Sequence, residues 1–301
     1  MEKIKLVFLG TSDAIPSKER NHTAILLNYK EENILFDCGE GTQRQFRKAD
    51  LNPCKITRIF ITHWHGDHVL GLPGLFQTLA FSKYGKKLEI YGPIGTKKYV
   101  NEMMTSFNFV NTFPIEVTEI LSAGKLLDGK DWYVEAEKML HGAPTLAYNF
   151  VKKGTLRIDK QKLKKYKIKP GPLLGKLKDG KNIVYEGKKY KFKDLTYEED
   201  AKKISIVLDT GKNDKIVGFV KDADLLISES TYGEELEERA KKYKHLTSKQ
   251  AGEIAKKAKV KKLIITHLSQ RYEFKKEQIL KEAKRIFPHV ELAKDFLSLE
   301  I

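Results

Sequence analysis

Short apolar runs, each closed by a polar or glycine-containing cluster, recur along the whole chain. They are rich in Ile, Val, Leu and Phe. Runs of this kind read as buried strands, and the residues at their C-terminal ends are where α/β folds place their chemistry. We therefore expect strands within residues 3–12, 24–29, 33–41, 58–68, 87–93, 149–154, 204–211, 224–231 and 262–269.

Helical periodicity lies between several of these runs. The clearest helix is expected over residues 247–257, which begin with Thr-Ser, carry apolar residues on one face and end in lysines. A second helix is expected over residues 277–287 and a third after Gly71. Strands that alternate with helices predict an α/β fold.

Two pairs of strand endings echo each other across the chain. The run ILFD ends at Asp37 and IVLD ends at Asp209, whereas FITH ends at His63 and IITH ends at His267. Each half of the chain therefore delivers an Asp and a Thr-His at strand ends. We interpret this as two similar α/β halves that face one another, with their strand ends converging on one site.

Charge is concentrated in one segment of an otherwise ordinary composition. The 301 residues are 41% hydrophobic and 10% aromatic, which indicates a globular protein with a substantial core. Residues 152–193 hold 16 Lys and Arg against 3 acidic residues, which is +13 of the total charge of +16. We interpret this segment as an inserted basic arm that favours a polyanionic partner. A solvated, lysine-rich surface loop is the alternative.

Cysteines and hydropathy narrow the cellular setting. Cys38 and Cys54 are too few for a disulfide framework. The N-terminus lacks a hydrophobic stretch long enough for a signal peptide, and no apolar run approaches the roughly 18 residues of a membrane span. We expect a cytoplasmic protein without a membrane partner.

The strongest local pattern is His-Trp-His-Gly-Asp-His at residues 63–68, directly after an expected strand. Imidazoles and a carboxylate this close together are costly to bury without cations. On a loop at a strand end they can supply nitrogen and oxygen ligands suited to Zn²⁺ or Mn²⁺. Incidental surface histidines are the alternative.

A site for two metal ions needs about seven ligands, so the rest of the chain should supply three more. His141, Asp209 and His267 are metal-type residues, and each lies at the end of an apolar run. We include these three residues in the candidate ligand set.

These motifs together resemble those of the ribonuclease Z family in its short form, the tRNA 3′-processing endonucleases of the metallo-β-lactamase superfamily. The histidine cluster alone would indicate only the superfamily. The narrower resemblance rests on FLGTS at 8–12, a PxKxRN element at 16–21, DCGEGTQRQ at 37–45, ESTY at 229–232, HLTS at 245–248, HLS at 267–269 and Arg-Tyr at 271–272.

The resemblance implies a fold and a ligand set. The fold would be a single αββα metallo-β-lactamase sandwich over residues 1–301, with the flexible basic arm, or exosite, inserted at 152–193. The cofactor would be Zn²⁺, with two ions per subunit. One ion would be held by His63, His65 and His141 and the other by Asp67, His68 and His267, with Asp209 bridging them.

The resemblance also implies an activity, the removal of the 3′ trailer from precursor tRNA after the discriminator nucleotide. The products would be a tRNA 3′-hydroxyl and a trailer 5′-phosphate. Asp67 would act as general base and His245 as general acid, with a helix-capping role as the alternative for His245. Asp37 would orient a ligand imidazole, unless it only forms a turn.

Substrate contacts follow from the same resemblance. Lys18 would approach a phosphate, and Arg20 and Asn21 would approach the 3′ end of the substrate. The arm, with Gly171 and Pro172 in its middle, would grip the tRNA elbow. The family further implies a homodimer in which the arm of one subunit serves the site of the other.

Two other functions fit parts of the sequence. A small-molecule hydrolase of the same fold, such as a phosphodiesterase, would leave the basic arm and the PxKxRN element unexplained. A non-catalytic RNA-binding module would be expected to have lost at least one ligand, whereas all seven candidate positions carry competent residues.

Overall fold

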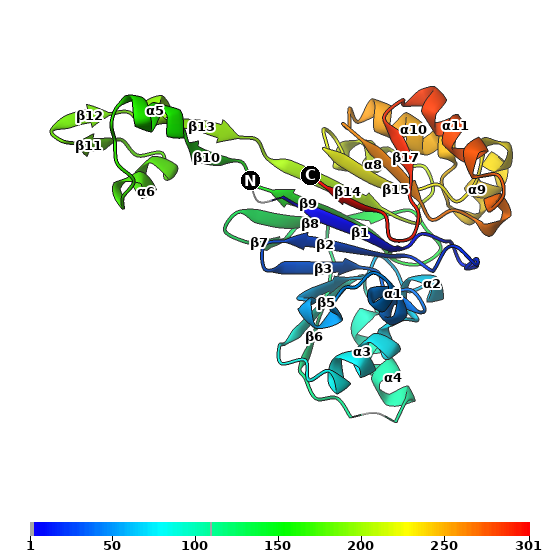
Figure 1. Ribbon diagram of the computed structural model, residues 1–301. Coiled ribbons are helices and arrows are strands. Elements are labelled where there is room, and N and C mark those ends of the chain that lie inside the picture. Colours follow the sequence, from blue (N-terminus) through cyan, green and yellow to red (C-terminus); the bar gives the residue numbers. More distant parts are fainter. Residues whose placement is uncertain (1–2, 109) are drawn as a thin grey trace.

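The computed structural model describes residues 3–108 and 110–301 and is built in four layers (Figure 1). Two seven-stranded sheets pack face to face, and helices cover the outer face of each sheet. This is the αββα sandwich implied by the resemblance. The expected α/β class and the two facing halves are confirmed.

The first sheet combines an antiparallel part with a parallel part. In sheet order its strands are β18 (Ser298–Glu300), β1 (Lys5–Gly10), β2 (Ala24–Tyr29), β3 (Glu32–Phe36), β4 (Arg58–Phe60), β5 (Leu88–Gly92) and β6 (Ile115–Glu119). The pairs from β18 to β3 are antiparallel and those from β3 to β6 are parallel. The carboxyl ends of β3 and β4 therefore lie at the same edge of the sheet.

The second sheet repeats this arrangement. In sheet order its strands are β7 (Gly124–Asp128), β8 (Trp132–Met139), β9 (Thr145–Lys152), β14 (Lys202–Val207), β15 (Leu225–Glu229), β16 (Leu263–Thr266) and β17 (Val290–Leu292). The pairs from β7 to β14 are antiparallel and those from β14 to β17 are parallel. Strand β14 thus occupies the place in its sheet that β3 occupies in the first.

Helices and short 3-10 turns connect the strands and cover the sheets. Next to the first sheet lie α1 (Thr42–Lys48), η1 (Pro53–Lys55), α2 (Gly66–Val69), α3 (Leu72–Phe81) and α4 (Thr96–Ser106). On the side of the second sheet lie α8 (Asp214–Phe219), η2 (Glu234–Leu236), α9 (Glu237–Tyr243), α10 (Ser248–Lys257), η3 (Gln270–Tyr272) and α11 (Lys276–Ile286). Among the described residues, no helix has the length and apolar character needed to cross a membrane.

The three expected helices are present as α10, α11 and α3. Helix α10 begins with a capping box, in which Thr247 Oγ1 accepts from the backbone N–H of Gln250 at 3.2 Å. The Gln250 side chain in turn accepts from the backbone N–H of Thr247 at 3.1 Å. The two bonds satisfy donors that a helix start leaves without partners, so the sequence Thr-Ser-Lys-Gln fixes where the helix begins.

An aromatic cluster between the two sheets supports the strand ends that carry the candidate ligands. Phe36 of β3 and Phe60 of β4 stack with ring centroids 5.5 Å apart, and Tyr148 of β9 packs against both. All three side chains are fully buried. The Tyr148 hydroxyl donates to the backbone carbonyl of Ile61 at 2.6 Å. Because this bond joins the sheets just ahead of His63, it holds the start of the histidine loop in place.

An arm projects from the sandwich between β9 and β14 (Figure 1). Its stalk is the antiparallel pair of β10 (Thr155–Ile158) and β13 (Thr196–Glu199). Its head contains α5 (Lys160–Lys165), α6 (Leu173–Lys178), β11 (Ile183–Tyr185), β12 (Lys188–Tyr190) and α7 (Phe192–Leu195). The projection thus spans 155–199, and the expected bounds of 152–193 start inside β9 and stop before the returning strand of the stalk.

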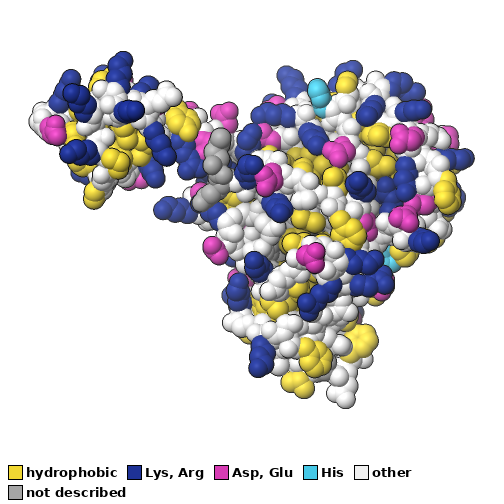
Figure 2. Space-filling model, in the orientation of Figure 1, with side chains coloured by type: hydrophobic (Ala, Val, Ile, Leu, Met, Phe, Trp, Pro, Cys, Tyr) yellow, Lys and Arg dark blue, Asp and Glu magenta, His cyan; other side chains and the backbone are white. Residues whose placement is uncertain are grey.

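These bounds change the charge of the arm. Residues 155–199 hold 14 Lys and Arg against 6 acidic residues, which gives +8. Basic side chains are spread over the face of the head seen in Figure 2, with hydrophobic side chains exposed between them. The head has its own small core of Leu163, Ile168, Leu177, Ile183 and Leu195, against which Tyr185, Tyr190 and Phe192 pack. These aromatic side chains therefore help to fold the arm.

Candidate metal centre

All seven candidate ligands converge at one edge of the sandwich. Residues 63–68 follow β4 and lead into α2, His141 lies between β8 and β9, and Asp209 and His267 follow β14 and β16. His63, His68, Asp209 and His267 are at most 2% exposed, whereas His65 is exposed. Parallel and facing strands thus bring together residues that lie up to 204 positions apart in the chain.

The first group contains His63, His65, His141 and Asp209, whose ligand atoms lie within 4.8 Å of one another. His141 Nε2 lies 3.2 Å from His65 Nδ1. Asp209 Oδ2 lies 3.7 Å from both His63 Nε2 and His141 Nε2.

The second group contains Asp67, His68 and His267, and it meets the other oxygen of the same carboxylate. Asp209 Oδ1 lies 3.4 Å from His68 Nε2 and 3.2 Å from His267 Nε2. Asp67 Oδ2 lies 3.3 Å from His68 Nε2 and 3.4 Å from His267 Nε2. Asp209 therefore presents one oxygen to each group, which is the placement that a carboxylate bridging two ions requires.

Unsatisfied polar atoms indicate that this pocket is built for cations. His63 Nε2 and Asp209 Oδ1 are buried without a hydrogen-bond partner. His68 Nε2 and His267 Nε2 point at each other across 3.3 Å. Buried polar groups left in this way are costly, and the cost disappears when their lone pairs bind metal. Imidazole and carboxylate donors fit Zn²⁺.

Three of the ligand histidines have a hydrogen-bond partner on their second ring nitrogen. His68 Nδ1 lies 2.6 Å from Asp37 Oδ2, and Asp37 also accepts from the backbone and the hydroxyl of Thr62, each at 2.7 Å. His141 Nδ1 donates to the carbonyl of Lys244 at 2.9 Å, and His267 Nδ1 lies 2.9 Å from the Thr231 hydroxyl. Such partners fix the ring orientations. Asp37 takes the orienting position expected from the sequence.

His245 lies beside the ligand groups with its Nδ1 turned to a carboxylate. That atom is 3.1 Å from both oxygens of Glu229 and 3.8 Å from Asp209 Oδ2. Burial lowers the pKa of His245, but the Glu229 and Asp209 carboxylates outweigh it and raise the pKa to about 9. Glu229 itself is fully buried and also binds Thr210 N–H at 2.6 Å and the Thr231 hydroxyl at 2.5 Å.

The sequence analysis gave no role to Glu229 or Thr231, although both lie in the ESTY motif. The available signal was their position at the end of an apolar run. That position is the same one that singled out Asp209 and His267.

Opposite charges dominate the electrostatics of the cluster. Burial raises the pKa of the Asp209 carboxyl, but His267, His68 and His63 outweigh it and hold the pKa well below its usual range. Burial lowers the pKa of His68, but the Asp209, Asp67 and Asp37 carboxylates outweigh it and raise the pKa well above its usual value. The ionised carboxylates are therefore available as ligands at neutral pH.

A cavity of about 470 Å³ opens onto the centre. It is lined by Asp13, Ala14, His65, Asp67, His141, Gly142, Asp209, Thr231, Tyr232, Lys242, Tyr243, Lys244, His245 and His267. Asp67 and His245 both face this cavity, so a substrate in it can reach the two expected acid–base residues and the ligands.

The loop of residues 16–21 carries three residues expected to contact the substrate, and these residues differ in exposure and in their hydrogen bonds. Lys18 is exposed. Arg20 is only 4% exposed and its guanidinium donates to the Thr11 hydroxyl at 3.1 Å. Asn21 is tied down by Asp295, which accepts from its backbone N–H at 2.8 Å. These side chains are not among those that line the metal-centre cavity.

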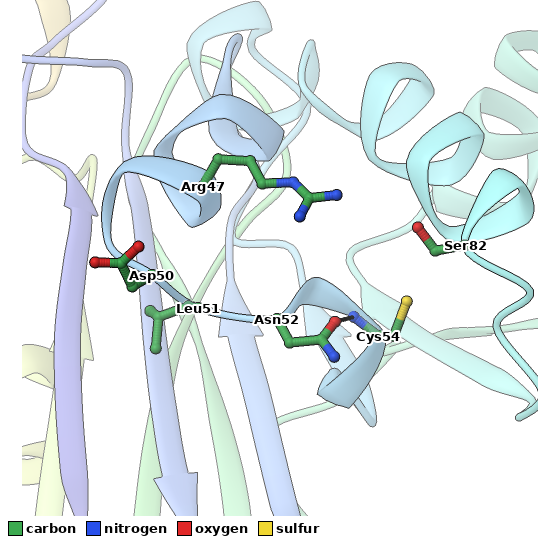
Figure 3. A pocket seen from close by; sticks show the side chains of 6 residues that line it. All are labelled: Arg47, Asp50, Leu51, Asn52, Cys54 and Ser82. Atoms are coloured by element: carbon green, nitrogen blue, oxygen red, sulfur yellow. Dashed lines mark hydrogen bonds between the residues drawn. The ribbon is translucent and has the colours of Figure 1, made fainter.

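Gly171 and Pro172 lie in the head of the arm, away from the cavity. A separate hollow near α1 is lined by Arg47, Asp50, Leu51, Asn52, Cys54 and Ser82 (Figure 3). Its lining contains none of the ligand groups, so it is not a second metal centre among the described residues.

Comparison with known proteins agrees with this geometry. Residues 4–105 match a family model described as anti-Pycsar protein Apyc1. Ribonuclease Z of Oceanobacillus iheyensis is 39% identical over 308 residues, which cover 99% of this chain and 100% of that protein. The crystal structure of the short form of human tRNase Z aligns with a TM-score of 0.72 and 29% identity, covering 98% of each chain.

The fold is shared more widely. The metallo-β-lactamase fold protein YhfI of Bacillus subtilis aligns with a TM-score of 0.72 over the whole of both chains at 19% identity. Sequence identity with the ribonuclease Z of Oceanobacillus iheyensis is 39% along nearly the full length, about twice the identity with YhfI. The chain therefore belongs to the ribonuclease Z family, within the metallo-β-lactamase fold.

Proposed function

We propose that the protein is a zinc-dependent endoribonuclease that removes the 3′ trailer from precursor tRNA. Cleavage follows the discriminator nucleotide and leaves a 3′-hydroxyl on the tRNA and a 5′-phosphate on the trailer. The observation that carries the proposal is the Asp209 carboxylate, with one oxygen facing each of two complete ligand groups. The relationship to the ribonuclease Z family is the reason for proposing precursor tRNA as the substrate.

The donor set supports two Zn²⁺ per subunit, assigned to the two groups and the shared Asp209. When bound, zinc would make water acidic enough to supply hydroxide near neutral pH and would offset the charge of the phosphate. The ligand side chains would hold the ions beside the cavity that receives the substrate.

Two side chains of the cavity would move protons. Asp67 would accept the proton of the attacking water. His245 would donate a proton to the departing 3′-oxygen, and its Nδ1 is already occupied by Glu229, so Nε2 is the nitrogen left for the substrate. Proton donation of this kind contributes about 10²- to 10⁴-fold to the rate.

The arm would bind tRNA at a distance from the cut, as an exosite inserted in a single domain of residues 1–301. Lysines neutralise phosphates without reading sequence, which suits a substrate family that shares its shape. Gly171 and Pro172 would approach the tRNA elbow from the exposed head of the arm. Lys18, Arg20 and Asn21 would act nearer to the 3′ end, Arg20 by shaping the loop from its buried position.

The placement of the arm supports a homodimer. The arm leaves the sheet at the end of β9 and returns at the start of β14, whereas His141 precedes β9 and Asp209 follows β14. The arm and its own metal centre thus lie at opposite ends of the same strands, separated by roughly 23 Å of β9 alone. A tRNA held by one arm would reach the centre of a second subunit. We also propose that the enzyme is cytoplasmic.

Cleavage of a 3′-extended tRNA transcript with and without a chelator tests the function. Chelator-sensitive cleavage is expected for the nuclease. Binding without cleavage would favour the RNA-binding module, and hydrolysis of only a small phosphodiester would favour the small-molecule enzyme.

A further inference from the structure

A cluster of lysines at the end of α9 borders the metal centre. Lys241, Lys242 and Lys244 lie within the four residues ahead of His245. Lys242 and Lys244 line the metal-centre cavity. Lys241 and Lys244 line a second hollow of about 330 Å³, which shares His245 with that cavity. The lysines therefore stand where the two hollows meet.

The charges of this cluster are largely available to a ligand. Lys241 and Lys242 are exposed, and among residues 3–108 and 110–301 no carboxylate forms an ion pair with either. Lys244 Nζ donates to the carbonyl of His141 at 3.1 Å, which draws its ammonium group toward the ligand histidine. Lys212, which also lines the second hollow, is already paired with Glu253 at 2.8 Å.

The end of a helix favours lysines for its own stability, but that effect does not account for the position of Lys244. Cations near a helix C-terminus typically contribute about 0.3–1 kcal/mol wherever the helix lies. Helix α10 also ends in two exposed lysines, Lys256 and Lys257, and neither lines a hollow next to the centre.

We propose that Lys241, Lys242 and Lys244 form a phosphate subsite for the last nucleotides of the tRNA body, on the 5′ side of the scissile bond. This inference rests on the proposed function. His245 donates its proton to the 3′-oxygen that departs with the tRNA body. Groups that adjoin His245 therefore face the nucleotide that carries this oxygen, while the trailer lies on the other side of the phosphorus.

This subsite differs from the arm in what it does for the reaction. The arm lies at the far end of β9 and β14. In the proposed function it would contribute affinity for the tRNA as a whole. The α9 cluster acts beside the reacting phosphate, so it would align the 3′ end in the cavity. Because it contacts the tRNA body, its contribution should not depend on trailer length.

The test compares the Lys241→Ala/Lys242→Ala double variant with Lys256→Ala/Lys257→Ala, which removes the same charges from the end of α10. The substrates are one precursor tRNA with a one-nucleotide trailer, the same tRNA with a long trailer, and a small phosphodiester. We expect kcat/KM for both tRNAs to fall about tenfold in the α9 variant and the slope of log kcat/KM against log salt to decrease by about two. The α10 variant should match the wild type.

Other outcomes would overturn the subsite. A loss confined to the long trailer would place the lysines on the trailer side. An unchanged salt slope would show that the lysines do not contact phosphates. A parallel loss of activity on the small phosphodiester would show that the lysines act on the metal centre itself. If the wild type cleaves no tRNA, the proposed function fails first, independently of the lysine variants.

Discussion

His245 Nδ1 lies 3.1 Å from both carboxylate oxygens of Glu229. Glu229 is fully buried, and its oxygens are also fixed by Thr210 and Thr231. The carboxylate is therefore positioned before any substrate arrives, and it sets both the orientation and the proton affinity of His245. An imidazole held in this way from one side is prepared to act as an acid from the other.

Replacing Glu229 with Gln should shift the pH profile of cleavage. The Glu229 carboxylate raises the pKa of His245, so the ring remains protonated to higher pH. The acid is lost as pH rises through this pKa, and the Gln variant should lose it at lower pH. The kcat profile on precursor tRNA should thus show its alkaline limb moved toward neutrality. An alkaline limb at the same pH as in the wild type would argue against His245 as the acid.

Metal content should follow the two ligand groups. His141→Ala affects only the first group, so the metal bound per chain should fall from about two ions to about one. Asp209→Ala affects both groups and should leave little metal. His289→Ala is the control, because His289 is exposed and lies in neither group. Elemental analysis of dialysed protein measures all three, and equal metal in the His141 and Asp209 variants would contradict the shared role of Asp209.

The stability of the protein at the base of the arm should depend on Glu199. Its carboxylate binds both Lys152 of β9 and Arg157 of the stalk, and Lys152 and Glu199 have side chains only 5% and 10% exposed. Glu199→Ala leaves a buried lysine without its partner, so the free energy of unfolding should fall by about 1–3 kcal/mol. Glu291→Ala breaks an exposed pair with Lys262 and should cost less than about 1 kcal/mol in the same urea titration. Equal losses would refute the role of Glu199.

Acid should weaken the contact of Glu199 with Lys152 and Arg157. Hydrogen bonds from Lys152 and Arg157 lower the pKa of Glu199 to about 2, below its ordinary value of 4.5. The contribution to stability is complete above the ordinary pKa and is lost as pH falls toward the folded value. The stability difference between wild type and Glu199→Ala should therefore narrow below pH 4.5 and be constant above it.

Deleting residues 157–190 should weaken tRNA binding and leave the catalytic reaction nearly intact. The arm contains none of the ligand groups, so hydrolysis of a small phosphodiester should change little. KM for precursor tRNA should rise by orders of magnitude, because the phosphate contacts of the arm are lost. Steady-state kinetics on both substrates measure the split. An equal loss on both would show that the arm supports the centre rather than the substrate.

The paired strand endings show how far the sequence alone could predict the fold. Asp37 follows β3 and Asp209 follows β14, and these strands occupy corresponding places in the two sheets. The His63 and His267 endings do not correspond, because His63 follows β4 and His267 follows β16, which lies one strand further out. A local motif predicts a strand end but not its place in the sheet, since that place depends on pairing between distant segments.

Other elements escaped the sequence analysis for physical reasons. Strand β6 alternates half-buried and exposed positions, so it presents no continuous apolar run. Glu229 is an acidic residue at a strand end, and only the fold shows that it lies behind His245. The stalk extends beyond residue 193, the end expected for the arm, because β13 pairs with β10, and pairing between distant segments leaves no local pattern in the sequence.

The most direct test of the account is to map the RNA ends produced from a 3′-extended tRNA by the wild type and by Asp67→Ala. The wild type should leave a 3′-hydroxyl after the discriminator nucleotide and a 5′-phosphate on the trailer. Asp67→Ala should bind the tRNA within a few-fold of the wild type and give no product. A fully active variant, or wild-type cleavage at another position or with other end groups, would contradict the assignment.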